Sequence, residues 1–284
     1  MGAAGDQLEL VYEDELDDSF TGLASEDGPM TVAGFGSLLS ERSARYTFPN
    51  LTDFRLGKVH GWRRVFAHTA DVFFARGIAR PDTAEIASLS LERCEPTSQQ
   101  PQWGVLVAQA TAGAPEGLPA PVAAAEAATP AVAAATPAAV VVSLFEVPAT
   151  PASVAAFIAR EHEFRFVAVE PTDMEGRPVG RKAVICARNT DADYRRLRCP
   201  PDEWARRWSP YGITRVWRDD VLPCRTYLRH CVLAARALGP QAEEAFLQGT
   251  FLADRRTTIA EHLARNPDIM EERPPPELSE RYNG

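Results

Sequence analysis

Residues 30–39 read MTVAGFGSLL. The first four are apolar or β-branched and predict a short buried strand, after which Gly34 and Gly36 turn the chain. Because neither glycine has a Cβ and both can adopt positive φ, the backbone here can approach a ligand closely. The N–H groups of the turn and the Ser37 hydroxyl would supply hydrogen-bond donors. We therefore place a ligand-binding turn directly after a core strand.

Known glycine motifs fit this turn poorly. A dinucleotide loop would need a third glycine where Leu39 stands and a long amphipathic helix after it, and the sequence has neither. A serine nucleophile elbow, G-x-S-x-G, would need glycine where Phe35 and Leu39 flank Ser37. A strand turn without any function remains an alternative.

Composition favours one elaborated domain. Of the 284 residues, 45% are hydrophobic and 8% aromatic, which suffices for a sizeable core. The formal charge of −9 disfavours nucleic acid as a partner, because phosphate binding needs a basic face. No apolar run approaches the roughly eighteen residues of a membrane helix, so we expect no membrane partner. The oligomeric state is not predicted.

The ends of the chain and the cysteines carry few signals. Residues 1–27 are acidic and resemble neither a secretory signal nor a transit peptide, so we expect a disordered, solvated tail and a cytoplasmic protein. Five cysteines without a C-x-x-C pair predict reduced thiols and no metal site. Cys224, His230 and Cys231 have helical spacing, which favours a helix face over a ligand set. Residues after 267 are expected to be extended and exposed.

Short β-prone segments dominate the first two thirds of the chain. Punctuated runs at 54–66, 71–81 and 85–92 predict a meander of antiparallel strands. Two more apolar strands are expected at 103–107 and 139–147. A hairpin is expected from 164–169 and 182–186. Between the two apolar strands, residues 109–139 are mostly Ala, Pro, Thr and Gly, and predict a disordered low-complexity insertion.

An acid falls on the apolar side of a predicted helix. Thr150 is a good N-cap and Pro151 suits the first helical position. Apolar residues follow at i, i+3 and i+4, namely Val154, Phe157 and Ile158. The next position of this stripe is Glu161, and a core-facing carboxylate must be paired, neutralised or directed into a cavity. In a cavity it would suit general acid/base chemistry. Alternatively the helix frays and the acid turns outward, or it pairs with Arg160 or Arg165.

The order of these segments resembles the ChaC-type branch of the gamma-glutamylcyclotransferase superfamily. In that family a strand leads into an aromatic-Gly-Ser-Leu turn, as at residues 35–38. A glycine-aromatic-arginine segment, an Arg-Gly turn and a Trp-Gly-Val strand follow, similar to residues 61–64, 76–77 and 103–105. The resemblance covers residues 28 to about 190, with gaps.

The resemblance also implies site residues. ChaC-type enzymes carry their catalytic glutamate in a pattern like Tyr-Leu-x-x-Arg-Glu, to which residues 157–161 (FIARE) are similar with one residue fewer before the acid. This implies Glu161 as the catalytic acid/base, with Glu163 as a competitor. The implied substrate-binding residues are Phe35, Gly36, Ser37 and Leu38. No metal and no cofactor are implied.

The last hundred residues lie mostly outside the resemblance. Helices are expected at 202–208, 225–238, 241–252 and 258–265, the last with a capping box from Thr258 and Glu261. Distinctive aromatic and basic side chains gather here: Trp204, Trp208, Trp217, Arg225, Tyr227, Arg229 and His230. An aromatic helical cap with ion-paired arginines is the favoured interpretation, and pocket walls are the alternative.

These observations predict an α+β fold, a mixed and partly closed β-barrel with flanking helices. Its parts are a tail at 1–27, a gamma-glutamylcyclotransferase-like domain at 28–190 and a helical C-terminal extension at 191–284. The implied function is a lyase that converts a γ-glutamyl amine compound, such as glutathione or a γ-glutamyl peptide, to 5-oxoproline and a free amine. The alternatives are a non-catalytic binding or interaction protein, and a hydrolase that uses Ser37 or Cys224.

Overall fold

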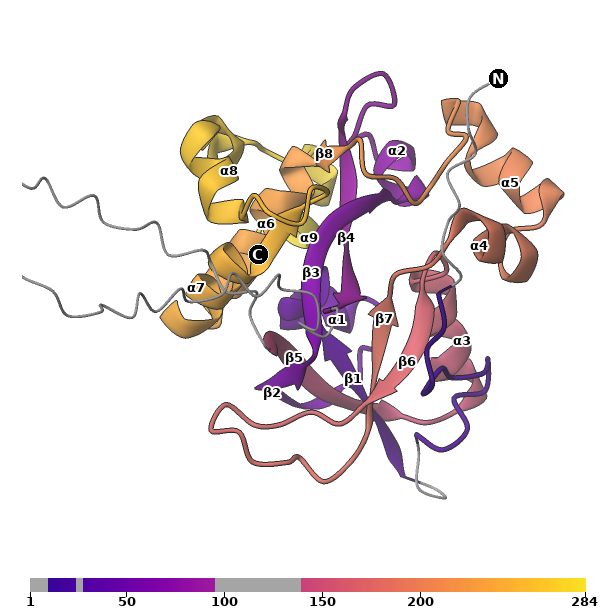
Figure 1. Ribbon diagram of the computed structural model, residues 1–284, viewed down its shortest axis with the longest axis vertical. Helices are drawn as coiled ribbons and strands as arrows, with labels where there is room; N and C mark the ends of the chain where they lie inside the picture. The colour runs from indigo at the N-terminus through magenta and orange to yellow at the C-terminus, as the bar shows by residue number, and fades with distance from the viewer. Residues whose placement is uncertain (1–9, 24–27, 95–138) are drawn as a thin grey trace, which may run out of the picture. The chain divides into compact units, whose positions relative to one another are not determined.

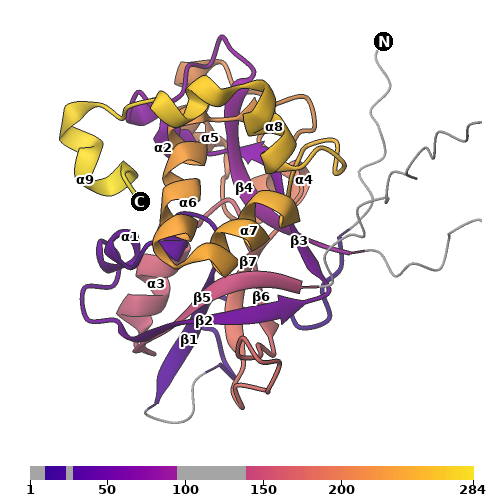
Figure 2. The same cartoon turned by 90° about the vertical axis from the view of Figure 1, so that its left-hand side faces the viewer.

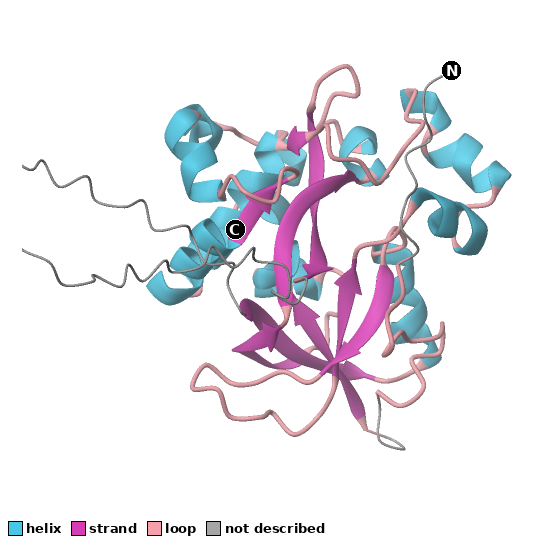
Figure 3. Cartoon of the chain, in the orientation of Figure 1, coloured by secondary structure: helices cyan, strands magenta, loops and turns pink. Residues whose placement is uncertain are grey.

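A mixed β-sheet is the centre of this α+β fold. The computed structural model describes residues 10–23, 28–94 and 139–284. Nine strands lie within these ranges: β1 Pro29–Gly34, β2 Thr52–His60, β3 Trp62–Thr69, β4 Glu85–Arg93, β5 Ala139–Pro148, β6 Arg165–Val169, β7 Ala183–Ala187, β8 Leu222–Pro223 and β9 Thr250–Leu252. Their order is β2-β5-β1-β7-β4-β3-β9, with β6 beside β7 and β8 beside β4 (Figure 1). The sheet curls into a half-barrel (Figure 3).

Strand β1 lies inside the sheet, as its apolar sequence predicts. It runs antiparallel to β5, with Val32 opposite Phe145, and parallel to β7, with Val32 opposite Val184. Met30 and Val32 are almost fully buried. A strand with partners on both sides and covered faces explains the continuous apolar run. The turn after β1 therefore starts from a rigid base.

The predicted meander is only partly correct. Residues 54–66 form two strands, β2 and β3, divided by Gly61 at φ 77. These strands do not pair with each other, because β2 pairs with β5 while β3 pairs with β4. Residues 71–81, expected as a strand, begin with helix α2, Asp71–Ala75. Phe73 and Phe74 pack there against tyrosines of the later helical segments, and this tertiary packing outweighs their β-propensity.

Other segments agree with the sequence. Strand β5, the antiparallel hairpin of β6 and β7, and helix α3 at Pro151–Arg160 are confirmed. The Thr150 side chain caps α3 by accepting a hydrogen bond from the Ser153 N–H. The strand expected at 103–107 and nearly all of the insertion expected at 109–139 lie outside the described residues.

Most helices of the described ranges lie in the last third of the chain. Those within the described ranges, besides α2 and α3, are α1 Glu41–Arg45, α4 Asp191–Leu197, α5 Pro201–Arg207, α6 Arg225–Ala237, α7 Pro240–Gly249, α8 Ile259–Arg265 and α9 Ser279–Tyr282. The four predicted helices correspond to α5 to α8, and the capping box of Thr258 and Glu261 is present. The helix predicted at 241–252 ends at Gly249, and residues 250–252 form strand β9 instead. Helix α6 lies over the sheet beside β4 and the turn after β1 (Figure 2). In the described ranges, no helix has the length and apolar character needed to cross a bilayer.

The segments near both ends differ from expectation. Residues 10–23 are not a solvated tail, because Tyr12 stacks on Trp62 and Phe20 packs against Phe166. Residues after 267 are not simply extended, since Ile269 and Tyr282 are buried. Residues after 190 also supply β8 and β9 to the sheet. Aromatic and aliphatic side chains scattered among charges produce this packing, and overall composition hides them.

Candidate active site

A polar cavity of about 490 Å³ lies where the turn after β1, helices α2, α6 and α9, and the end of α3 meet. This volume falls within the roughly 300–1,000 Å³ typical of small-molecule sites. Ser37, Glu161 and Glu163 all line the cavity. The structure thus brings together the predicted turn and both candidate acids.

Lack of space, rather than positive φ, explains the two glycines of the turn. Neither Gly34 nor Gly36 uses the positive φ that glycine permits. A Cβ on Gly36 would lie 2.6 Å from the Tyr227 hydroxyl oxygen, and a Cβ on Gly34 would lie 2.4 Å from the Leu38 Cβ. Glycine therefore allows the backbone to pack closely against α6 and against itself.

The four predicted binding residues border two adjoining spaces. Ser37 lines both the large cavity and a small pocket of about 30 Å³. Phe35, Gly36 and Leu38 line the small pocket but not the large one, and Glu161 lines both. The Phe35 and Leu38 side chains belong to the core. A ligand in the large cavity would therefore meet the turn at Ser37.

The buried guanidinium of Arg64 holds the turn after β1 in place by a hydrogen bond. Arg64 on β3 is 1% exposed, and its Nε–H donates to the Phe35 carbonyl at 3.0 Å. Its other nitrogens donate to the carbonyls of Val141 and Ala245. Burial lowers the pKa of Arg64 to about 9, so it is still charged at neutral pH. Three carbonyl oxygens, rather than a carboxylate, compensate this buried charge.

Glu161 ends helix α3 at the cavity wall, with its side chain 17% exposed. Its Oε1 accepts a hydrogen bond from the Arg160 Nε–H at 2.7 Å. Arg160 also donates to the Ser37 Oγ at 3.1 Å and to the Thr47 Oγ1 at 2.8 Å. The pairing with Arg160, one alternative left open by the sequence, therefore coexists with a position at the cavity. The arginine connects the acid to the turn.

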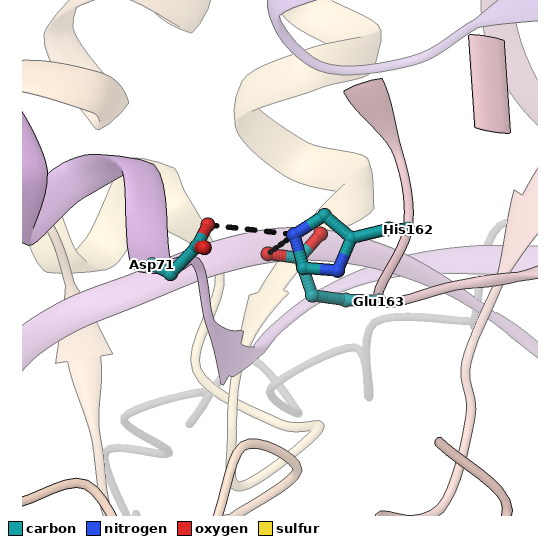
Figure 4. A group of neighbouring side chains, drawn as sticks. All are labelled: Asp71, His162 and Glu163. Atoms are coloured by element: carbon teal, nitrogen blue, oxygen red, sulfur yellow. Dashed lines mark hydrogen bonds and ion pairs between the residues drawn. The ribbon is translucent and has the colours of Figure 1, made fainter. Parts of the chain in front are cut away.

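A second acidic group lies on the same wall, where His162 stands between Asp71 and Glu163 (Figure 4). Burial raises the pKa of Glu163 to about 7. Burial alone would lower the pKa of His162, but the carboxylates of Glu163 and Asp71 outweigh it and raise that pKa. The Tyr194 hydroxyl lies 2.9 Å from His162 Nδ1 and fixes the ring. Glu163 therefore keeps its proton to a higher pH than an exposed glutamate does.

Asp71, His162 and Glu163 also offer three possible metal ligands, with atoms within 4.8 Å of one another. An arginine already supplies the positive charge there. Arg207 Nη1 donates to Asp71 Oδ2 at 2.9 Å and lies 3.3 Å from His162 Nε2. A cation bound by these atoms would have to displace that guanidinium. We therefore interpret the group as an ion-paired cluster.

Two buried histidines complete the cavity wall. Burial lowers the pKa of His68 to about 3 and that of His230 to about 4, so both rings are neutral at pH 7. His230 Nδ1 accepts a hydrogen bond from the Gly284 N–H at 3.1 Å, which places the ring proton on Nε2. His230 Nε2 has no hydrogen-bond partner among the described residues. The Ser37 backbone lies close enough to interact with this ring and opposes the fall in its pKa.

Sequence reasoning missed several residues of this cavity: Asp71, Arg76, Arg207 and Arg281. Asp71 was placed in a strand, and Arg281 in an exposed tail. Tyr227 and His230 were noted on the expected C-terminal helix, and both line the cavity. Arg225, from the same group, is ion-paired as the helical-cap interpretation predicts, but its partners are Glu85, Asp268 and Glu272 rather than the acids nearer in sequence, Asp219, Asp220, Glu243 and Glu244. If residues 71–75 had been predicted as a helix, Asp71 would have been recognised as an acid in its first turn.

Comparisons with known proteins add little. No family model and no curated protein matches this chain. Among solved structures, an uncharacterized human protein aligns with 86% of this chain and 99% of its own length, at 9% identity and a TM-score of 0.40. A likeness at this level assigns neither a family nor a function.

Proposed function

We propose that this protein is a gamma-glutamylcyclotransferase-like lyase that converts a γ-glutamyl amine compound to 5-oxoproline and the free amine. The observation that carries the proposal is the position of Glu161. Its carboxylate is sheltered from bulk solvent, lines the same cavity and small pocket as Ser37, and is joined to Ser37 through Arg160. An acid/base beside a binding turn is the equipment that this reaction needs.

The reaction is intramolecular and balances without a co-reactant. The α-ammonium of the γ-glutamyl group loses a proton to the carboxylate, and the resulting amine attacks the γ-carbonyl carbon. A C–N bond closes the five-membered lactam, and the C–N bond to the departing amine breaks as that amine takes up a proton. Orientation contributes much of the rate, because both reacting groups belong to one molecule. In this proposal the Ser37 hydroxyl and the Arg160 guanidinium, which share a hydrogen bond, bind the α-carboxylate or the developing oxyanion.

Two carboxyl groups compete for the acid/base role. Glu161 lies next to the turn, with Oε1 paired to Arg160 and Oε2 without a hydrogen bond among the described residues. Glu163 lies toward α2, where burial brings its pKa near neutral pH, a value suited to proton exchange. We assign the role to Glu161 because it adjoins Ser37 in both spaces. Glu163 is then the partner of His162 in the ion-paired cluster.

The hydrolase alternative has less support. Burial raises the pKa of the Cys224 thiol to about 12, and this thiol donates to the Ile78 carbonyl at 3.2 Å. In the described part of the chain, the Ser37 hydroxyl has its hydrogen bond with Arg160 and none with an imidazole. Neither side chain therefore has a base to activate it as a nucleophile. A non-catalytic binding protein on the same fold remains the second candidate, because ligand binding needs the cavity but no acid/base.

The test is an assay of 5-oxoproline after the purified protein is incubated with a panel of γ-glutamyl compounds. We expect product from the wild type, and a fall in kcat of roughly 10²- to 10⁴-fold in Glu161→Gln, as is typical for loss of a general acid/base. Glu175→Gln, at an exposed turn, is the matched control. If Glu163→Gln alone abolishes product, the role passes to Glu163. If no panel member yields 5-oxoproline, the lyase proposal is wrong and the binding alternative takes its place.

A further inference from the structure

The two glutamates of the cavity wall belong to one short turn. Helix α3 ends at Arg160, and the Phe164 N–H then donates to the Glu161 carbonyl at 3.1 Å. The Asn189 Nδ2–H donates to the Glu163 carbonyl, also at 3.1 Å, and holds the far side of this turn in place. Both glutamates line the same cavity. Two carboxyl groups can therefore reach one ligand from neighbouring positions.

The surroundings of these two carboxyl groups differ in charge. Glu161 lies 2.7 Å from the Arg160 guanidinium, and such a cation favours the charged, proton-accepting form of a carboxyl group. Glu163 has no arginine or lysine within ion-pairing distance in the described part of the chain, and it is 4% exposed. A buried carboxyl group without a guanidinium favours its neutral, proton-donating form. The pKa of Glu163, which burial raises to about 7, agrees with this difference.

His162 connects Glu163 to the rest of the cluster. Its Nε2 lies 3.5 Å from Glu163 Oε1 and 3.4 Å from Asp71 Oδ1 (Figure 4). The positive charge that this ring gains on protonation is thus divided between two carboxyl groups. Asp71 is also paired with Arg207. The imidazole is therefore close enough to return a proton to Glu163, while the permanent positive charge on this wall is directed to Asp71.

We propose that Glu163 is a second catalytic residue, the general acid that protonates the departing amine, while Glu161 acts as the base. This inference rests on the proposed function and divides its two proton transfers between two groups. Neighbouring carboxyl groups whose surroundings favour opposite protonation states are a common basis for such a division. One pairing with arginine and one burial without arginine are sufficient to produce it here.

The proton transfers of this mechanism balance. Glu161 accepts one proton from the α-ammonium, whose freed electron pair forms the new C–N bond, and the attacking nitrogen loses a second proton to water. As the old C–N bond breaks, its electron pair stays with the departing nitrogen. That nitrogen takes the proton of Glu163 and, once released, a further proton from water. Transfer of one proton from Glu161 to Glu163, through water or His162, restores both groups.

The experiment compares γ-glutamyl-p-nitroanilide with γ-glutamyl-p-nitrobenzylamide, which differ by one methylene. The nitroaniline departs readily, whereas the basic benzylamine needs a proton as its bond breaks. We measure kcat/KM for 5-oxoproline release in the wild type, Glu163→Gln and Glu161→Gln. Glu163→Gln should lower the value for the benzylamide roughly 10²-fold or more and that for the anilide less than about tenfold, because only the first requires a general acid. Glu161→Gln should lower both alike, and the exposed Glu175→Gln neither.

The same measurements separate this inference from the lyase proposal. If Glu163→Gln lowers both compounds by the same factor, or lowers neither, Glu163 is not the general acid, and turnover by the wild type leaves the lyase proposal intact. If the wild type releases 5-oxoproline from neither compound nor from any γ-glutamyl peptide of the panel, the lyase proposal is wrong and the general acid with it. Circular dichroism shows whether each variant folds, and Glu163→Met replaces Glu163→Gln if that variant does not.

Discussion

Glu163 is a carboxyl group that the fold keeps almost entirely from water, at 4% exposure. Burial raises its pKa to about 7 from an ordinary value of 4.5, so the folded protein binds this proton more tightly than the unfolded chain does. The contribution of Glu163 to stability is therefore best at low pH, decreases as the pH rises from about 4.5 to about 7, and stays unfavourable above that range. His162 has a raised pKa and contributes with the same sign.

Glu163→Gln should remove this pH dependence. Relative to the wild type, the free energy of unfolding of the variant should rise by roughly 3 kcal/mol between pH 4.5 and pH 8, the equivalent of the change in pKa. Urea unfolding at several pH values, followed by circular dichroism, measures the difference. Glu175→Gln reports the effect of losing an exposed carboxylate. Parallel curves for wild type and Glu163→Gln across this range would show that the carboxyl group titrates normally in the folded state.

Residue-level chemistry was only partly visible in the sequence. The apolar stripe of α3 places Glu161 at the core side, and a spacing rule is enough to find it. The raised pKa of Glu163 could not be foreseen, since it depends on burial beside His162 and Asp71, and Asp71 is 92 positions before Glu163 in the chain. Periodicity reports which face of an element is buried, but not which other element covers it.

At the level of elements, Arg64 connects strand β3 to three neighbours. Its guanidinium donates to the Phe35 carbonyl in the turn, to the Val141 carbonyl on β5 and to the Ala245 carbonyl on α7. The group is a buried cation whose hydrogen bonds go to backbone oxygens of three different segments. Removing it should therefore cost more than removing a surface arginine.

We expect Arg64→Met to lower the free energy of unfolding by about 2–4 kcal/mol, because the apolar chain fills the space but loses three hydrogen bonds from a charged donor. The neighbouring Arg63→Met, which loses a single ion pair to Glu92, should cost less than about 1 kcal/mol. Urea unfolding of both variants gives the comparison. Equal costs would mean that the carbonyls find other donors or water, and that Arg64 is not what fixes the turn.

Elements were predicted best where local signals agree with the fold. Helix α8 has its capping box, α3 has its N-cap threonine and proline, and β1 has a continuous apolar run. The strand predicted at residues 71–75 was wrong. Two adjacent phenylalanines favour a strand locally, but their contacts with Tyr211 and Tyr227 hold them in a helix. The strand partners were wrong for a similar reason: β2 pairs with β5, which lies about 80 residues later in the chain, and no local pattern reports such a pairing.

On the scale of the whole molecule, the segment of residues 10–23 covers a sheet edge. Strand β6 pairs with β7 on one side. On the other, the Leu16 N–H donates to the Phe166 carbonyl and the Ala168 N–H donates to the Asp14 carbonyl, each at 2.8 Å. Covering an edge in this way protects it from pairing with another chain. Acidic composition suggested a solvated tail, because the few aromatic residues that anchor the segment are outnumbered by charges.

Phe20→Ala tests whether this segment belongs to the core. The Phe20 ring is 3% exposed and lies 5.2 Å from the Phe166 ring and 6.0 Å from the Phe157 ring. Loss of a buried phenylalanine typically costs about 3–5 kcal/mol, but undocking of the segment caps the cost, so we expect about 2–4 kcal/mol. The control is Val11→Ala, since Val11 is 75% exposed. Hydrogen exchange at the Ala168 amide should quicken in Phe20→Ala alone. If both variants unfold at the same urea concentration and the amide exchanges at the wild-type rate, the segment is a tail after all, and β6 is an open edge.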